Sequence, residues 1–306
     1  IMGLLGIFIM IGFYYKWSIS AFTLLWTATY LMQKSAYNNH YYLLILISIF
    51  MLIVPAHRYL SYDTRKRNID EHYAMPQWVN LFIILQLFIV YVYASLAKMY
   101  PDWLDLSVAE TLMSYKKNYP LVGELLQLQP VLYIIAYFGI FFDLLIVPLL
   151  LWKKTRMAAF VLSIFFHLFN SIIFGIGIFP YLSLAFILFF FPPKTIKKKF
   201  KLKKPFYDKN EIVKPDYKSG LISFFVLWFV IQLFLPMRHH FINGNVLWTE
   251  EGHRMSWRMM LRVKRNTNNF KVVNLETNET KHIYNKVYLT PKQIRSLSKP
   301  DFIWQY

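Results

Sequence analysis

The sequence predicts an α-helical polytopic membrane protein with a small β-rich extramembrane part at its C-terminus. Three observations support this fold class. The 306 residues are 57% hydrophobic and 19% aromatic, with a mean hydropathy of +0.35, values far from those of ordinary soluble domains. Apolar stretches long enough to span a bilayer recur as far as residue 236, and the composition then becomes polar and mixed. We therefore expect a transmembrane domain over 1–236 and an extramembrane domain over 237–306.

The apolar stretches predict about seven or eight membrane spans. They cover residues 1–15, 17–32, 41–55, 77–99, 131–152, 157–174, 176–192 and 220–236. Several of them are short, and only Lys16 separates the first two. Gly175, Gly177 and Pro180 interrupt the region over 157–192, so broken or re-entrant helices are compatible with both places.

Basic residues predict the orientation of these spans. Lys and Arg number 34 against 16 Asp and Glu, and many of them lie between apolar runs. Such runs are typical of cytoplasmic loops, which places 153–156 and 194–204 inside. Counting crossings from there puts 56–76 inside as well, and 38–40 and 100–130 outside. Recognition of lipid headgroups is the alternative interpretation of the basic runs; we do not expect nucleic acid as a partner.

The region after Pro236 is also predicted to lie outside. Its segment FKVVNLETNETKHIYNKVYL, residues 270–289, alternates as two strands around a Thr-Asn-Glu-Thr turn. The chain begins at Ile1 within an apolar segment and stops at FIWQY, so we expect a missing N-terminus and a truncated C-terminal domain. It has no cysteine, which excludes disulfides and thiolate metal sites. No nucleotide-binding or metal-binding motif is present, so the sequence predicts no metal site.

Lys98, at the end of the 77–99 stretch, is a candidate catalytic base. An ammonium group that is partly removed from water loses hydration, which lowers a lysine pKa and makes free amine available near neutral pH. The alternative is a lysine whose head extends to the interface and anchors the helix end. His40 begins the 41–55 span, and the predicted topology places it at the same outer face. Two titratable nitrogens that meet can orient or deprotonate one another.

Three further polar residues lie within apolar stretches. Asp143 lies in the middle of FFDLLIVP, where a charge costs about 2.5–3.5 kcal/mol on insertion scales, so it must be paired, protonated or functional. His167, Asn170 and Ser171 share one helix face. Interhelical hydrogen bonding and a ligand-facing role both remain open for this set.

Four segments together resemble the vitamin K-dependent gamma-carboxylase family, including its bacterial members with the horizontally transferred transmembrane domain. The segments are NNHYYL at 38–43, AKMYPDWL at 97–104, FHLFNSIIFGIGIFPY at 166–181 and NVLWTEEGHRMSWRMML at 245–261. Weaker similarity, in HRYLSYD and FFDLL, lies between them, so the resemblance covers most of residues 1–265.

The resemblance implies a two-part reaction. In the family, a lysine amine deprotonates vitamin K hydroquinone, or here a related menaquinol, and the anion reacts with O2 to give a strongly basic alkoxide. The alkoxide removes a γ-proton from glutamate, CO2 captures the carbanion, and the quinone leaves as its epoxide. Lys98 matches the base and His40 matches the assisting histidine. The positions expected to shape the quinone site are matched by Asn39, Asp143, His167 and Asn170.

The implied partners are membrane lipid, the quinone and a glutamate-containing protein or peptide. The absence of cysteine favours a bacterial cytoplasmic-membrane homologue, with the active site near the outer face. Two other functions remain open within the resemblance: a quinol oxygenase or epoxidase without carboxylation, and a non-catalytic protein that binds quinone or lipid. A transporter or channel would also place His, Asp and Asn inside a helical bundle.

Overall fold

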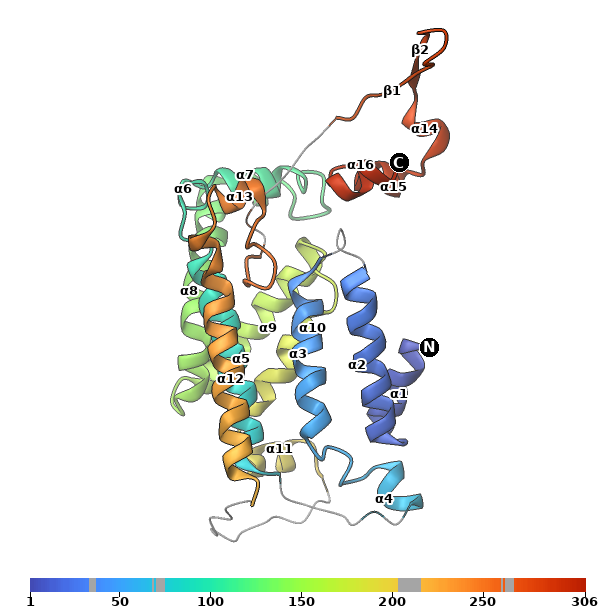
Figure 1. Cartoon of the computed structure of the whole chain (residues 1–306). Coiled ribbons are helices and arrows are strands. Elements are labelled where there is room, and N and C mark those ends of the chain that lie inside the picture. The colour runs from blue at the N-terminus through green and yellow to red at the C-terminus, as the bar shows by residue number, and fades with distance from the viewer. Residues whose placement is uncertain (33–36, 68, 70–74, 203–215, 260, 262–266) are drawn as a thin grey trace.

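The structure is a computed structural model of the chain, and it describes residues 1–32, 37–67, 69, 75–202, 216–259, 261 and 267–306. Most described residues are helical, and the long helices form an upright bundle (Figure 1). The bundle helices are α1 (Met2–Ile11), α2 (Tyr15–Met32), α3 (Asn39–Ile53), α5 (Gln77–Leu96), α8 (Gln129–Leu151), α9 (Arg156–Ile173), α10 (Phe179–Ile187) and α12 (Lys218–Met237).

Short helices lie at the two ends of the bundle (Figure 1). At one end are α4 (Tyr62–Lys66) and α11 (Pro193–Lys199); at the other are α6 (Pro101–Leu104), α7 (Ser107–Ser114) and α13 (Val246–Thr249). Short 3₁₀ turns cover Leu125–Gln127, Leu188–Phe190 and Arg238–Phe241.

Judged by length and composition, the described residues contain four or five candidate membrane spans, and the predicted seven or eight are not shown. Within the described ranges, four helices are long and apolar enough to cross a bilayer: α5, α8, α9 and α12 with its continuation to Phe241. A fifth is reached if the residues from Phe179 to Lys199, bent by 117° at one break, form a single span. Each predicted stretch overlaps a helix, but α1 has 10 residues and α3 has 15, fewer than the roughly 20 that a bilayer core needs.

The interruption predicted within 157–192 is present. Helix α9 ends at Ile173, Gly175 takes a left-handed φ of 64°, and Pro180 lies in the first turn of α10. Glycine adopts this conformation without the penalty that a Cβ would bring. The chain therefore leaves helical geometry for a few residues between two apolar helices.

Helix α5 is the central element of the core. Its Phe82 is fully buried and stacks on Phe50 of α3, with ring centroids 3.7 Å apart. Its Gln86 is also fully buried, and accepts a 2.9 Å hydrogen bond from the indole of Trp228 on α12. Gln86 in turn donates to Gln232 on α12 at 3.4 Å. Aromatic packing and a satisfied polar network thus hold α3, α5 and α12 together.

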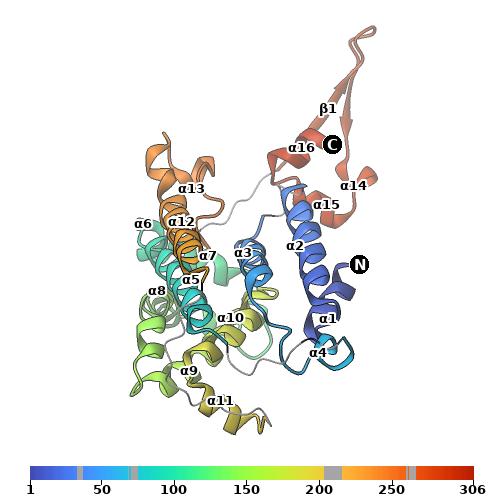
Figure 2. The same ribbon diagram turned by 60° about the horizontal axis from the view of Figure 1, so that its bottom comes forward.

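The predicted C-terminal hairpin is confirmed, but the surrounding domain is less β-rich than expected. Strands β1 (Phe270–Val273) and β2 (Thr280–Ile283) pair antiparallel, with Phe270 opposite Ile283, and the hairpin projects away from the bundle (Figures 1 and 2). The other described elements after residue 241 are helices: α13, α14 (Asn285–Tyr288), α15 (Pro291–Ser296) and α16 (Pro300–Gln305). A capping box of Thr290 and Gln293 starts α15, which is a helix signal in the sequence just after the predicted strands.

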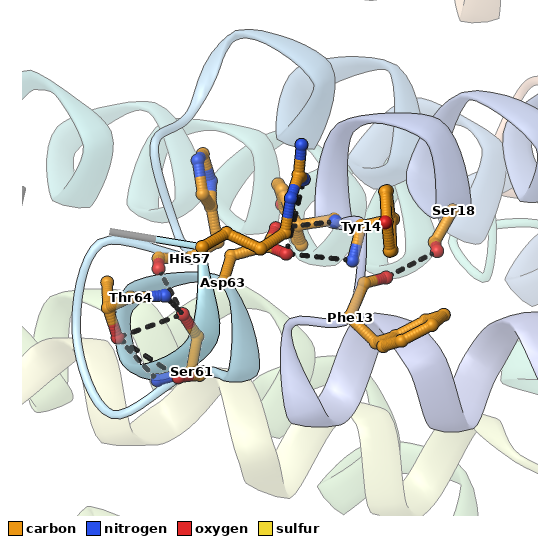
Figure 3. A network of polar contacts seen from close by, with 9 residues as sticks. Phe13, Tyr14, Ser18, His57, Ser61, Asp63 and Thr64 are labelled. Carbon is orange, nitrogen blue, oxygen red and sulfur yellow. Dashed lines mark hydrogen bonds and ion pairs between the residues drawn. The ribbon is translucent and has the colours of Figure 1, made fainter. Parts of the chain in front are cut away.

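A buried carboxylate caps the start of α2 from a distant part of the chain (Figure 3). Asp63, 2% exposed, accepts hydrogen bonds from the backbone N–H groups of Tyr14 at 3.0 Å and Tyr15 at 2.9 Å. These are N–H groups at the beginning of a helix, which have no partner within the helix itself. Asp63 also forms a 3.4 Å ion pair with Arg67.

The turn before α2 docks closely on the same segment. Gly12 ends α1 with a φ of 66°, and its carbonyl accepts a 3.1 Å hydrogen bond from the Asp63 N–H. A Cβ at Gly12 would lie 2.4 Å from the Cβ of Ser61. The start of α2, the end of α1 and α4 therefore form one closely packed corner of the fold.

We predict that Asp63→Ala destabilises this corner by about 1–3 kcal/mol, because it removes a charged acceptor from two backbone N–H groups. The expected result is a lower thermal unfolding midpoint of the purified protein in detergent. The control is Glu276→Gln, an exposed acidic residue of the hairpin turn, which should leave the midpoint unchanged. An unchanged midpoint for Asp63→Ala would show that the cap does not stabilise the fold.

Candidate functional site

A cavity of about 590 Å³ lies among α3, α5, α8, α9 and the loop before α10. Most of its wall is apolar, and it carries the side chains of Phe138, Phe165, Phe166, Phe169, Phe174 and Phe179. Polar side chains of Lys98, Asp143, His40 and Asn170 also line it. A cavity of this volume and character fits one organic ligand with a hydrophobic ring.

A buried ion pair lies in the wall of this cavity. Lys98 is the second residue after the end of α5, and its ammonium donates a short hydrogen bond to the Asp143 carboxylate in the middle of α8. The Lys98 residue is 7% exposed and Asp143 is 6% exposed. The ammonium therefore points into the bundle, unlike an anchoring lysine whose head extends into water. Of the expected alternatives for Asp143, the structure shows a paired carboxylate.

Two side-chain to backbone hydrogen bonds fix the helices on either side of the pair. Ser95 on α5 donates to the carbonyl of Ile140 on α8 at 2.9 Å. The indole of Trp103 on α6 donates to the carbonyl of Ala136 at 3.2 Å, and its ring lies 5.9 Å from the Lys98 ammonium. The ammonium thus has a defined position relative to the cavity.

His40 and Asn39 enter the cavity wall from the start of α3. The side chain of Asn38 caps this helix by accepting from the His40 N–H at 3.2 Å. His40 is 8% exposed, and its ring lies 6.0 Å from that of Phe179. The side chain of Asn39 donates to the carbonyl of Arg258 at 2.9 Å. His40 and Lys98 share the cavity, but no hydrogen bond joins them in the part of the chain that the structure describes.

His167 and Asn170, both on α9, lie differently relative to the cavity. His167 is fully buried behind the cavity wall, and its Nε2 lies 3.0 Å from the hydroxyl of Tyr91, a residue that lines the cavity. Asn170 lines the cavity itself and donates to the carbonyl of Phe166, one turn earlier, at 2.9 Å. His167 thus makes an interhelical contact, whereas Asn170 is placed to face a ligand. Five of the six predicted site residues line the cavity.

Comparison with known protein families assigns both parts of the chain. Residues 1–194 match the HTTM domain, and residues 217–306 match the lumenal domain of vitamin K-dependent gamma-carboxylase. This chain belongs to the vitamin K-dependent gamma-carboxylase family. Its candidate spans and both matches make it an integral membrane protein. No solved structure matches the chain. The predicted domain boundary after residue 236 stays a prediction.

This gamma-carboxylase family member also has cavity residues that the sequence did not single out. Tyr91 lies within the apolar helix α5, where the sequence pattern indicates only a packing role, but it lines the cavity. His253 and Arg258 come from the segment after α12 and line the cavity. Tyr37 also lines it, and its hydroxyl accepts a 2.6 Å hydrogen bond from the Met255 N–H. The segment 245–261 was part of the resemblance, but only the fold brings it back over the start of α3.

The Lys98–Asp143 pair predicts strong non-additivity of substitutions in this family member. Lys98→Met or Asp143→Leu alone leaves one charge buried without its partner, which costs about 3–5 kcal/mol. The double variant removes both charges and should lose much less than the sum of the two. Thermal unfolding midpoints of the four proteins in detergent measure this coupling. Additive losses would show that the two side chains do not stabilise one another. The control is Lys117→Met, a substitution of an exposed lysine outside the pair.

Proposed function

We propose that this protein is a vitamin K-dependent gamma-carboxylase-like membrane enzyme. It would oxygenate a quinol, vitamin K hydroquinone or a related menaquinol, to its epoxide and couple this reaction to carboxylation of protein glutamate. The observation that carries the proposal is the buried Lys98–Asp143 pair in the wall of a largely aromatic cavity. Membership of the family supports the same chemistry.

The cavity suits a flat apolar ring. Phenylalanine side chains form much of its wall, and they prefer offset or edge-to-face contact with another aromatic ring. Among its lining residues, Gly139 on α8 would bring a Cβ within 4 Å of no other atom. This glycine therefore leaves room where the neighbouring turns carry larger side chains. When bound there, the quinol supplies the oxygen chemistry and generates the strong base that glutamate requires.

Lys98 is the base in this proposal. The ammonium of the pair first releases its proton to water that enters the cavity. The neutral amine then accepts a proton from a hydroxyl of the bound quinol and becomes an ammonium again. Asp143 faces that ammonium and stabilises the positive charge as it forms, in the same way as the carboxylate behind a catalytic base. His40, on another wall of the cavity, orients the hydroxyl. Tyr91 carries the contact with His167, which holds the tyrosine ring in place.

The glutamate side chain would approach from the extramembrane end. His253 and Arg258 line that part of the cavity, and a guanidinium group attracts and orients a carboxylate. CO2 would be captured in the same space. The helices α4 and α11 with their basic residues lie at the opposite end of the bundle (Figure 1). By the positive-inside rule, this arrangement supports an orientation in which the cavity lies near the outer face of the membrane.

We predict that Lys98→Ala abolishes both products in an assay of the complete protein in nanodiscs with hydroquinone, O2, labelled bicarbonate and a glutamate-containing peptide. Epoxide and fixed label are followed separately, because the base acts before either product forms. Asp143→Asn should lower the turnover of both by at least about a hundredfold, since removal of a positioned proton-transfer partner costs this much or more. Lys117→Ala, an exposed lysine outside the cavity, is the control.

Each outcome of this assay assigns a function. Epoxide without label in the wild type would favour an oxygenase without carboxylation. Retention of quinone by wild type that forms neither product would favour a non-catalytic binding protein and contradict the proposed enzyme. Full activity of Lys98→Ala would overturn only the assignment of Lys98 as the base.

Gly139→Leu tests the position of the quinol. Because the added side chain projects into open cavity space, we expect it to raise the KM for the quinol about tenfold or more without lowering the thermal unfolding midpoint. A leucine in place of glycine within a helix gains roughly 0.5–1 kcal/mol of intrinsic helix stability. Gly220→Leu in α12, also in open space but exposed and far from the cavity, is the matched control. An unchanged KM would place the quinol elsewhere.

A further inference from the structure

A second cavity, of about 280 Å³, lies at the opposite end of the bundle from the ion pair, where α4 packs against the start of α2 (Figures 1 and 3). We call it the basic pocket. Its wall consists of Tyr14, Lys16, Trp17, His57, Arg58, Asp63, Arg67 and Ile69. The proposed reaction uses none of these residues.

The wall of the basic pocket carries an excess of positive charge. Lys16, Arg58 and Arg67 contribute three cations and Asp63 one carboxylate, so two positive charges remain in excess. The carboxylate is largely engaged, because both of its oxygens accept backbone N–H groups of the α2 turn. The guanidinium of Arg67 also lies 4.2 Å from the ring centre of Tyr14. The pocket is therefore electrostatically suited to an anion.

His57 adds an unused polar atom to this wall. It is 5% exposed and stacks on Tyr15, with ring centroids 4.9 Å apart, and its Nδ1 is buried without a hydrogen-bond partner in the described chain. Burial lowers the pKa of His57 from 6.5, and the nearby cations lower it further, against the opposing effect of Asp63. The ring is thus held neutral, and a buried nitrogen without a partner is costly.

Aromatic side chains place the basic pocket at a membrane surface. Trp17 is 76% exposed and Tyr14 is 44% exposed, and such residues are enriched where the bilayer meets water. Lys153 and Lys154 in the turn between α8 and α9, and the lysines of α11, lie at the same end of the bundle (Figure 1). This end therefore suits the leaflet that carries anionic lipids.

We propose that the basic pocket binds the phosphate group of an anionic phospholipid, with Lys16 and Arg58 as the main phosphate contacts. The exposed aromatic rings favour a lipid over free phosphate, which has no apolar part for them to contact. The bound headgroup would bridge the start of α2 to the segment that leads into α4. It would stabilise the corner that Asp63 already closes, independently of any reaction at the ion pair.

The test uses the full chain in nanodiscs of phosphatidylcholine alone and of phosphatidylcholine mixed with phosphatidylglycerol. Phosphatidylglycerol should raise the thermal unfolding midpoint of the wild type. Lys16→Ala should lose most of this shift, and native mass spectrometry should show its affinity for phosphatidylglycerol lowered about tenfold, the loss of one charge-assisted contact. Lys16 has an exposed side chain, so the variant is expected to fold. The control is Lys154→Ala, an exposed lysine at the same end, which should keep the full shift.

A second arm separates the two sources of phosphate. Inorganic phosphate is titrated into nanodiscs of phosphatidylcholine alone, with wild type and Lys16→Ala. A Lys16-dependent shift at low phosphate concentration would support the anion site but overturn the lipid as its ligand. An equal phosphatidylglycerol shift in wild type and Lys16→Ala, or no shift in either, would overturn the proposal. Arg58→Gln should reproduce the loss seen with Lys16→Ala.

Discussion

The ion pair between Lys98 and Asp143 is the constraint on which the functional end of the bundle depends. A carboxylate in the middle of an apolar helix cannot remain charged without a partner, and the partner here is Lys98, the second residue after the end of α5. To bring the two together, α5 and α8 must pack side by side in one register. The hydrogen bond from Ser95 to the carbonyl of Ile140 holds that register one turn away from the pair.

Once α5 and α8 are fixed, the position of the cavity follows. Trp103 covers the ammonium on one side, where its indole is bonded to the backbone of α8. Helix α9 ends at Ile173, and Gly175 in the break that follows also lines the cavity. The residues of the break and the aromatic face of α9 then become the walls. The charge that is expensive to bury thus lies beside space that a ligand can occupy, which is the usual combination at functional sites.

The sequence could predict the polar residues of the site but not their depth or their partners. On energetic grounds Asp143 had to be paired, protonated or functional, yet its partner Lys98 is 45 positions away, and no local periodicity encodes that contact. His167 and Asn170 share a helix face, and only the packing of α5 against α9 places Tyr91 between His167 and the cavity.

The C-terminal hairpin was predictable because the alternation of residues along a strand is a local pattern. The predicted number of spans is not shown in the described residues, because helices such as α1 and α3 are shorter than a bilayer core requires.

The start of α3 connects the cavity to the extramembrane part of the chain. Tyr37 accepts from the backbone of Met255, and Asn39 donates to that of Arg258, so the residues on either side of the capping Asn38 are fixed by the segment after α12. His40 follows in the first turn of α3 and lines the cavity. The orientation of the imidazole therefore depends on how the extramembrane segment docks. In the proposed reaction the quinone arrives from the membrane and the peptide from water, so this docking would physically link the binding of one substrate to the binding of the other.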